Sequence, residues 1–537
     1  MSNGHIGRSS LILASGTVVS RVLGFISAVV LAQTLGTVGA GADTFALANQ
    51  LPNNVYAIVA GGILSAVLVP QIVRASMHDD GGARYINKLL TLGFSVFGGV
   101  TVVATLAAPA LVALYAGQAG QGGFTGNDIA LATAFAWWCL PQVLFYAVYS
   151  LLGEVLNARG VFGPFTWAPA LNNIVAIVGM IVLGMVFTGD VTDSAAWSPL
   201  AISVLAGSAT LGVATQAGIL FVFLRRAGVN FRPDFAFRGV GLGHATRLAG
   251  WTFGMIVLTQ IAGIVQTNVA SIAAGSGEPS LAVLRFSWLI FMLPHSVATV
   301  SLATAYFTRM SADVRDNRLD SLIGDIRESL SRIGLFMVIA SVAILVLALP
   351  MAAIFGGSFP SIQGMAWVLG GFALGLVPFS VVFVLQRVFY ALEDTRTPFF
   401  IQAVHSGVFI VGALLLSMTD PAQIAVGIAV LTSVVGTIQA VLLVVVLRRR
   451  LGRLGGNQMV SAFGRFALAS IPATGAGIIA MYFLGGYSEF GWGLQSMAST
   501  LIALVVAGLV MMAAYVGSLL LVRDPHIRVM LSGIRGR

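Results

Sequence analysis

An arginine lies in the middle of the first apolar stretch of the sequence. Arg21 follows Ser20 and precedes Val22, and no neighbouring residue in the sequence neutralises its charge. An ionisable group at bilayer depth costs about 2.5–3.5 kcal/mol on insertion scales, so such groups usually face a cavity or a partner. Because a guanidinium can hold a phosphate through two parallel hydrogen bonds, we interpret Arg21 as a fixed cation for an anionic group inside a cavity. The alternative is an arginine that caps carbonyl groups or pairs with a distant acid.

Other polar side chains interrupt later apolar stretches. Arg285 either joins the same cavity or reaches the outer membrane interface. Asn49 and Asn53 are four residues apart, so on a helix they share one face. Gln260 lies within a further apolar run. Each amide taken alone is better explained as a hydrogen bond between helices than as a substrate contact, but together they predict polar surfaces that face one another.

The sequence contains no pattern that indicates an enzyme. No phosphate-binding G-x-x-x-x-G-K-[ST] motif occurs, so we expect no ATP hydrolysis by this chain. A single Cys excludes an internal disulfide and a Cys-ligated metal cluster. The six His residues form no H-x-x-H pair. We therefore predict a protein without a catalytic site, a metal or a cofactor.

The composition explains where these residues must lie. Of the 537 residues, 58% are hydrophobic and 9% are charged, and the mean hydropathy is +0.95. Soluble domains have about 25% charged and about 45–50% apolar residues. The composition therefore excludes a soluble enzyme, a disordered chain and a nucleic-acid-binding domain, and the net charge of +9 is a signal of membrane topology.

Long apolar segments predict membrane-spanning helices, each of which needs about 20 residues. Fourteen such segments are expected, at residues 11–35, 47–73, 89–114, 129–156, 167–187, 199–224, 247–274, 281–307, 332–356, 364–392, 398–418, 422–447, 463–484 and 494–522. The sequence thus predicts an all-α, polytopic membrane protein.

The charges between these segments alternate in sign. Connections 1–2, 3–4 and every later odd-numbered one contain no Lys or Arg, whereas the even-numbered connections and both termini carry nearly all of them. The positive-inside rule therefore places both termini in the cytoplasm. The longest cytoplasmic connection, about residues 308–331, carries charges of both signs and is expected to form a short interfacial helix.

An internal repeat relates the two halves of the chain. The segment Leu51–Val55 reads LPNNV and Leu293–Val297 reads LPHSV, at an offset of 242 residues. The turns that end in Pro164-Phe165 and Pro398-Phe399 repeat at an offset of 234 residues. Six spans separate the copies, so both have the same orientation. We expect a pseudo-two-fold axis along the membrane normal, with six-helix lobes at 1–226 and 227–455 and two further helices in 456–537.

Several motifs occur in the order found in one family. They are SRVLGF at 20–25, ADTF at 42–45, LPN at 51–53, VP at 69–70, LNA at 156–158, APALNN at 168–173 and FYALEDTRTP at 389–398. In these motifs, which span the first twelve predicted helices, the chain resembles the MurJ/MviN family of the MOP exporter superfamily. The resemblance implies a fourteen-helix transporter in the bacterial plasma membrane. It implies that the chain flips lipid II, the undecaprenyl-pyrophosphate-linked peptidoglycan precursor, for cell-wall synthesis and cell shape.

The resemblance also adds one site residue and predicts partners. Of the charges that the family places in its cavity, Arg21 and Asp43 match, whereas Ser27, Ala28 and Met292 stand where many members have charged residues. We therefore expect Asp43 to join the substrate-binding set. The expected partners are lipid II, membrane lipids, and proteins of cell-wall synthesis or division, with no nucleic acid.

Three other functions remain open at this point. The chain could flip another polyprenyl-linked glycan, by the same cavity chemistry. A cation-coupled drug exporter of the same superfamily is a second alternative, although such a protein needs a carboxylate at mid-span and this sequence offers none there. A scaffold that recruits cell-wall enzymes without transport is a third.

Overall fold

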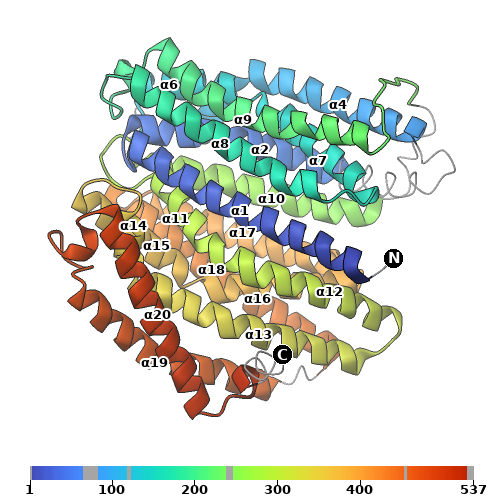
Figure 1. Cartoon of the computed structure of the whole chain (residues 1–537), viewed down its shortest axis with the longest axis vertical. Coiled ribbons are helices and arrows are strands. Elements are labelled where there is room, and N and C mark those ends of the chain that lie inside the picture. Colours follow the sequence, from blue (N-terminus) through green and yellow to red (C-terminus); the bar gives the residue numbers. More distant parts are fainter. Residues whose placement is uncertain (1–2, 64–82, 118–122, 238–245, 453–455, 529–537) are drawn as a thin grey trace. The chain divides into compact units, whose positions relative to one another are not determined.

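The computed structural model describes residues 3–63, 83–117, 123–237, 246–452 and 456–528. Within these ranges the chain is almost entirely helical and contains no strand (Figure 1). Contacts divide it into two compact units, Met1–Gly277 and Glu278–Arg537. The all-α class expected from the composition is thereby confirmed, and each unit is described by itself below.

The first unit contains nine of the labelled helices in its described residues. These are α1 (Asn3–Leu35), α2 (Ala40–Ile63), α4 (Ala83–Leu106), α5 (Ala108–Ala116), α6 (Gly126–Cys139), α7 (Gln142–Ala158), α8 (Gly163–Val186), α9 (Pro199–Arg226) and α10 (Thr246–Ser271). Helix α1 packs along α8, α8 along α9, and α10 against α2 and α5.

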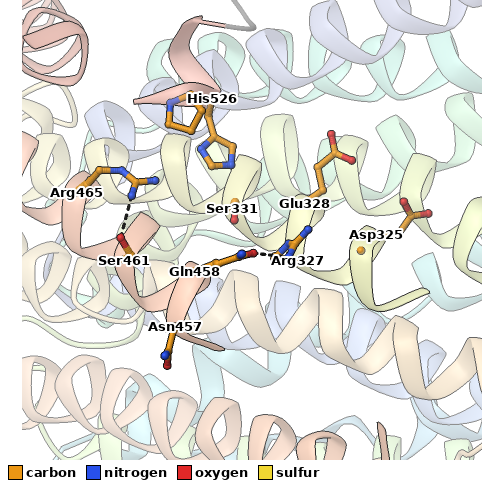
Figure 2. Close-up of a pocket in the computed structure, with 11 residues that line it drawn as sticks. Asp325, Arg327, Glu328, Ser331, Asn457, Gln458, Ser461, Arg465 and His526 are labelled. Carbon is orange, nitrogen blue, oxygen red and sulfur yellow. Dashed lines mark hydrogen bonds between the residues drawn. The ribbon is translucent and has the colours of Figure 1, made fainter. Parts of the chain in front are cut away.

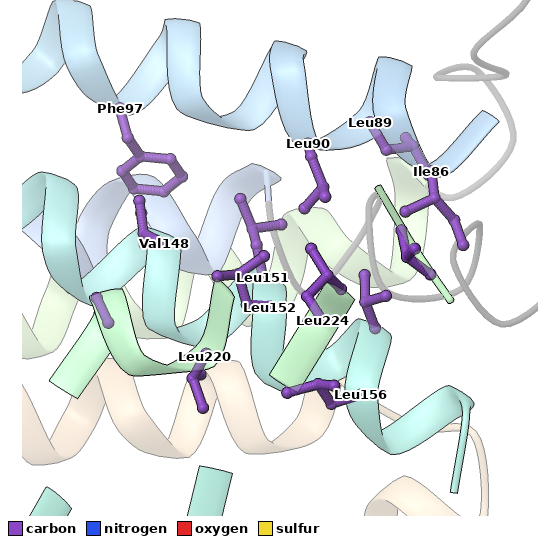
Figure 3. Packing of buried hydrophobic residues seen from close by; sticks show 14 of the residues in the cluster. Ile86, Leu89, Leu90, Phe97, Val148, Leu151, Leu152, Leu156, Leu220 and Leu224 are labelled. Carbon is purple, nitrogen blue, oxygen red and sulfur yellow. The ribbon is translucent and has the colours of Figure 1, made fainter. Parts of the chain in front are cut away.

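The core of this unit lies where α4, α7 and α9 meet (Figure 3). Leucines on one face of each helix interdigitate there, because residues three and four positions apart share a face. The buried residues that Figure 3 labels are Ile86, Leu89, Leu90, Phe97, Val148, Leu151, Leu152, Leu156, Leu220 and Leu224. This contact holds together helices that are up to 138 positions apart in the chain (residues 86 to 224).

The second unit contains ten labelled helices in its described residues. These are α11 (Leu281–Pro294), α12 (Val300–Arg315), α13 (Leu319–Val346), α14 (Ala348–Ala353), α15 (Phe359–Ala373), α16 (Leu376–Ala391), α17 (Arg396–Leu416), α18 (Pro421–Leu451), α19 (Gly456–Phe483) and α20 (Met497–Leu521). Helices α13, α19 and α20 share a core of Leu335, Ile339, Phe466 and Tyr515. The Tyr515 hydroxyl donates to the Leu335 carbonyl across 3.0 Å, so this core also contains a polar tie.

Twelve helical segments of the described residues are long and apolar enough to cross a membrane, and a thirteenth forms if the bent pair α15 and α16 counts as one span. The remaining predicted span, 47–73, begins within α2 but continues past Ile63 into residues outside the described ranges. The multi-pass character is therefore confirmed, whereas the count of fourteen stays a prediction. Several predicted spans are broken, for instance between α6 and α7 at Leu140-Pro141, because proline lacks a backbone donor.

The predicted interfacial helix at 308–331 is wrong as a separate element. Helix α12 continues to Arg315 and α13 already begins at Leu319, so the connection is only three residues long. The reason is an apolar face that the sequence reading missed. Leu322, Ile326 and Leu330 recur every four residues and are buried, which extends the spanning helix into the charged segment.

The two turns of the internal repeat have the same backbone construction. After α7, Gly160 has a φ of 72° and the N–H of Val161 donates to the Leu156 carbonyl five residues back. After α16, Glu393 has a φ of 55° and the N–H of Asp394 donates to the Phe389 carbonyl, also five residues back. In both turns, a residue in the left-handed backbone conformation ends the α-helix. The same arrangement also ends α9 at Gly228, α12 at Asn317 and α20 at Arg523, so the repeat and the lobe boundaries at 226 and 455 stay predictions.

Candidate functional site

Five of the six predicted site residues lie in the first unit. Arg21 is on α1, Asp43, Asn49 and Asn53 are on α2, and Gln260 is on α10. Helix α2 contacts both α1 and α10, so these three helices are neighbours within the unit. The structure therefore groups residues that are far apart in the sequence on adjoining helices.

Arg21 occupies the border between two faces of α1. On one side the chain packs closely on α8, where the Asn173 amide donates to the Ser20 carbonyl across 3.1 Å. On the other side Val18 and Val22 are 59% and 53% exposed. The Arg21 side chain is itself half-buried, and no carboxylate of the described residues lies within 4 Å of it. The alternative of a salt-bridged structural arginine therefore finds no partner in the described part of the chain.

Asn49 belongs to a hydrogen-bond network that connects three helices. The buried amide of Gln142 on α7 donates to the Asn49 side-chain oxygen across 3.3 Å and to the Thr210 hydroxyl on α9 across 3.1 Å. The Tyr146 hydroxyl donates to the Gln142 carbonyl oxygen across 3.0 Å. The sequence analysis did not single out Gln142, although a glutamine directly after Pro141 inside an apolar run is the signal that could have found it.

The remaining predicted residues of the first unit differ in exposure. Asn53 is exposed, whereas its neighbour Asn54 is buried and hydrogen-bonded to Tyr115 of α5. Gln260 is half-buried on α10. Asp43 is fully buried in the first turn of α2, where a carboxylate interacts favourably with the positive end of the helix dipole. Asn53 is thus the exposed amide of the predicted set, and Asn49 and Gln260 are half-buried.

In the second unit the predicted residue Arg285 is exposed on α11, and its neighbours in the sequence, Leu284 and Phe286, are buried.

His295, which the sequence analysis did not assign to the site, is a buried polar residue of the same predicted span. His295 begins a π-helical turn after Pro294, and its Nδ1 lies 3.0 Å from the Ser380 hydroxyl of α16. A π-turn inside a helix often marks a functional site.

A second polar contact of this unit connects α17 and α18. The Gln439 amide donates to the Gln402 carbonyl oxygen across 3.0 Å, and Gln439 also hydrogen-bonds His405. Amide contacts therefore cross between helices in both units, at Gln142 and at Gln439. Such bonds position helices in a membrane, where water cannot compete for the polar groups.

The second acidic residue of the motif FYALEDTRTP, Asp394, has a structural role in the turn before α17. The Asp394 carboxylate accepts hydrogen bonds from the backbone N–H and the hydroxyl of Thr397, at 2.9 and 2.7 Å, and pairs with Arg450. Burial opposes the charge, but these hydrogen bonds and the arginine together lower the pKa of Asp394 below its usual value. The motif thus places a carboxylate that accepts two hydrogen bonds beside the first turn of α17.

With these sites described, comparisons with known proteins decide the family. A profile described as "Lipid II flippase MurJ" matches residues 31–502. The chain belongs to the MurJ lipid II flippase family. It is 27% identical over 538 residues to a probable lipid II flippase MurJ of Vibrio cholerae, covering 96% of this chain and 95% of that protein. It is 28% identical over 404 residues to a protein of the same description from Haemophilus influenzae, covering 71% of this chain and 75% of the relative.

Solved structures confirm the fold of this MurJ family member. A lipid II flippase MurJ in an inward closed conformation matches with a TM-score of 0.71 at 17% identity, over 95% of this chain and 100% of that one. An inward-facing multidrug resistance MATE transporter of the MOP superfamily matches with a TM-score of 0.63 at 16% identity, over 83% of this chain and 99% of that one. The family resemblance found in the sequence motifs is confirmed by the profile match over residues 31–502.

Proposed function

We propose that this chain moves lipid II from the inner to the outer leaflet of the bacterial plasma membrane, with both termini in the cytoplasm. The observation that carries the proposal is the match of the lipid II flippase family over residues 31–502. The half-buried Arg21 supports it, because a guanidinium without a carboxylate partner in the described residues suits a pyrophosphate. Asn53, Gln260 and Arg285 are the accessible side chains that would contribute further hydrogen bonds to the headgroup.

In this mechanism the headgroup occupies a polar cavity of the transporter while the polyprenyl tail stays in the bilayer. Alternating access then exposes the cavity first to the cytoplasm and later to the outer side. A membrane potential that is negative inside favours outward movement of an anionic headgroup, by about 2.3 kcal/mol per charge per 100 mV. The buried amide contact at Gln142 would keep α2, α7 and α9 together while a lobe moves as one body.

The test is the accessibility of lipid II on the outer leaflet after depletion of this protein in cells. A membrane-impermeant reagent that modifies only outer-leaflet lipid II should label at least about tenfold less after depletion, while total lipid II accumulates. Re-expression of the chain is the control and should restore labelling. Unchanged labelling would contradict the proposal.

The same experiment separates the alternatives. If labelling of lipid II is unchanged but another polyprenyl-linked glycan disappears from the outer leaflet, the chain flips that glycan. If every lipid-linked glycan is still exported and cell-wall enzymes lose their location, the chain is a scaffold. A drug exporter would change sensitivity to toxic compounds without changing any lipid-linked sugar.

A further inference from the structure

A polar cavity of about 640 Å³ lies in the second unit, apart from every residue assigned above. Its walls come from the first turns of α13, the start of α19 and the segment that follows α20 (Figure 2). The side chains that matter for its chemistry are Arg327, Ser331, Gln458, Ser461, Arg465 and His526. The cavity thus brings two guanidinium groups, an imidazole, two hydroxyls and an amide together at one end of three helices.

Hydrogen bonds hold the cationic side chains in place. Arg465 donates through Nε to Asp524 at 2.7 Å and through Nη1 to the Ser461 hydroxyl at 2.9 Å, the second of which is drawn in Figure 2. Its Nη2 has no hydrogen-bond partner among the described residues. The backbone N–H of His526 donates to the same Asp524 at 2.9 Å. Donors fixed in this way lose little conformational entropy when a ligand binds.

The charges of the cavity do not cancel. Three carboxylates lie in or beside it, and each has its own arginine: Asp325 pairs with Arg309, Glu328 with Arg332, and Asp524 with Arg465. Arg327 instead donates to the amide oxygen of Gln458 and has no carboxylate partner among the described residues (Figure 2). One positive charge therefore remains at the cavity wall. In Figure 2 the carboxylates of Asp325 and Glu328 turn away from Arg465 and His526.

Apolar surface adjoins the cavity on the same helices. Leu468, one turn along α19 from Arg465, is 65% exposed, and Val460 is 74% exposed. Leu521, at the end of α20 and three residues before Asp524, is 85% exposed. In a membrane protein such side chains contact acyl chains. A ligand of this cavity can therefore have a phosphate at the arginines and hydrocarbon along α19 and α20.

We propose that the cavity binds the phosphate of a membrane phospholipid, as a site separate from the residues assigned to transport. A phosphodiester carries a single negative charge, which matches the one uncompensated guanidinium at Arg327. The unengaged Nη2 of Arg465 and the hydroxyl of Ser331 supply further donors. This inference does not depend on which lipid-linked substrate the chain transports.

The test uses the full chain purified in a neutral detergent. Three compounds are titrated at constant total detergent: short-chain phosphatidylglycerol, a diacylglycerol with the same chains and no phosphate, and inorganic phosphate. Bound lipid is counted by native mass spectrometry, and the thermal unfolding midpoint is recorded. We expect saturable binding of phosphatidylglycerol with a rise in the midpoint, no effect of the diacylglycerol, and at least about tenfold weaker binding of inorganic phosphate.

Two variants decide whether the cavity is responsible. Arg327→Gln removes the uncompensated charge and should weaken phosphatidylglycerol binding about tenfold. Gln458→Leu releases Arg327 from its anchor and should weaken binding less. The matched control is Arg315→Gln, which removes an exposed arginine outside the cavity and should leave binding unchanged. All three residues are at exposed or half-buried positions, so we expect these variants to fold.

Three outcomes would overturn the proposal. If Arg327→Gln and Gln458→Leu bind phosphatidylglycerol as the control does, the cavity is not the site. If the phosphate-free diacylglycerol binds equally well, the phosphate is not recognised. If inorganic phosphate binds as tightly as phosphatidylglycerol, the site takes a soluble phosphate and the lipid assignment is wrong.

Discussion

Arg465 and Asp524 form an ion pair between α19 and the segment after α20, with 2.7 Å between Nε and Oδ2. The carboxylate is fully buried, whereas the arginine side chain is 26% exposed. Two backbone features place Asp524 there: Arg523 has a φ of 58°, and the Asp524 N–H donates to the Leu519 carbonyl. This pair therefore connects the segment that follows α20 to α19.

Replacing the buried carboxylate should loosen that end of the second unit. We expect Asp524→Asn to lower the free energy of unfolding by about 1–3 kcal/mol, because Arg465 loses its charged partner but remains partly solvated. Thermal unfolding in detergent measures the change. Asp316→Asn, which removes an exposed carboxylate paired with Arg315, is the control and should leave the midpoint unchanged. Equal midpoints for both variants would show that the pair contributes nothing.

The same pair predicts a dependence of stability on pH. Burial opposes the charge of Asp524, but hydrogen bonds from Arg465 and from the His526 N–H prevail and lower its pKa below the usual value. A carboxylate with a lowered folded-state pKa contributes stability that is fully present above its unfolded value of about 3.9 and is lost as the pH falls further. The difference in unfolding midpoint between the wild type and Asp524→Asn should therefore be constant near neutral pH and shrink below about pH 4. A difference that grows on acidification would contradict this assignment.

The amide network of the first unit can be tested at its central residue. Gln142→Leu removes the donors to Asn49 and Thr210 and the acceptor of Tyr146. Hydrogen bonds between helices in a membrane are worth about 0.6 kcal/mol on average, so we expect a loss of about 1–2 kcal/mol in unfolding free energy. Gln423→Leu, at an exposed position near the start of α18, should have no effect. A variant at Gln142 that unfolds like this control would exclude a structural role for the network.

Close packing of α8 on α9 depends on a glycine. A Cβ at Gly212 would lie 2.4 Å from Oδ1 and 2.9 Å from the backbone O of Asn172. We expect Gly212→Ala to destabilise the first unit by about 1–3 kcal/mol through overpacking. A Cβ added at Gly218, on the same helix, would have no neighbouring atom within 4 Å. Gly218→Ala should therefore be neutral or slightly stabilising. Unfolding midpoints of the two variants should differ in that direction, and a reversed order would refute the packing interpretation.

The proposed role of Arg21 predicts a graded series. Arg21→Ala should fail to support growth of a bacterial strain depleted of its own lipid II flippase, with viable counts reduced at least about tenfold. Arg21→Lys should support growth partially, because an ammonium holds a phosphate as a point charge without the bidentate geometry. Arg225→Ala, at the exposed end of α9, is the control and should grow normally. Immunoblots of the membrane fraction establish that each variant inserts, and normal growth of Arg21→Ala would remove Arg21 from the site.

The sequence by itself determined the class of this protein. Runs of about 20 apolar residues require spanning helices, and the motif order from Ser20 to Pro398 predicted the family that the profile match confirms. These features are local or sequential, so they can be read without knowing which helices touch. The same reading singled out Arg21 and Asn49 as candidates, because a polar residue in an apolar run stands out wherever it lies.

Only the tertiary structure decided which polar groups share a contact. Asn49 meets Gln142 from 93 positions away, and Arg465 meets Asp524 from 59 positions away. Nothing in either local sequence specifies the partner. The extension of α13 back to Leu319 was also missed, because its charges hid a buried stripe that appears only when α13 packs. Hydropathy reports the transfer of a segment into lipid, whereas pairing depends on which helix faces are buried against each other, and that is settled only when the whole chain folds.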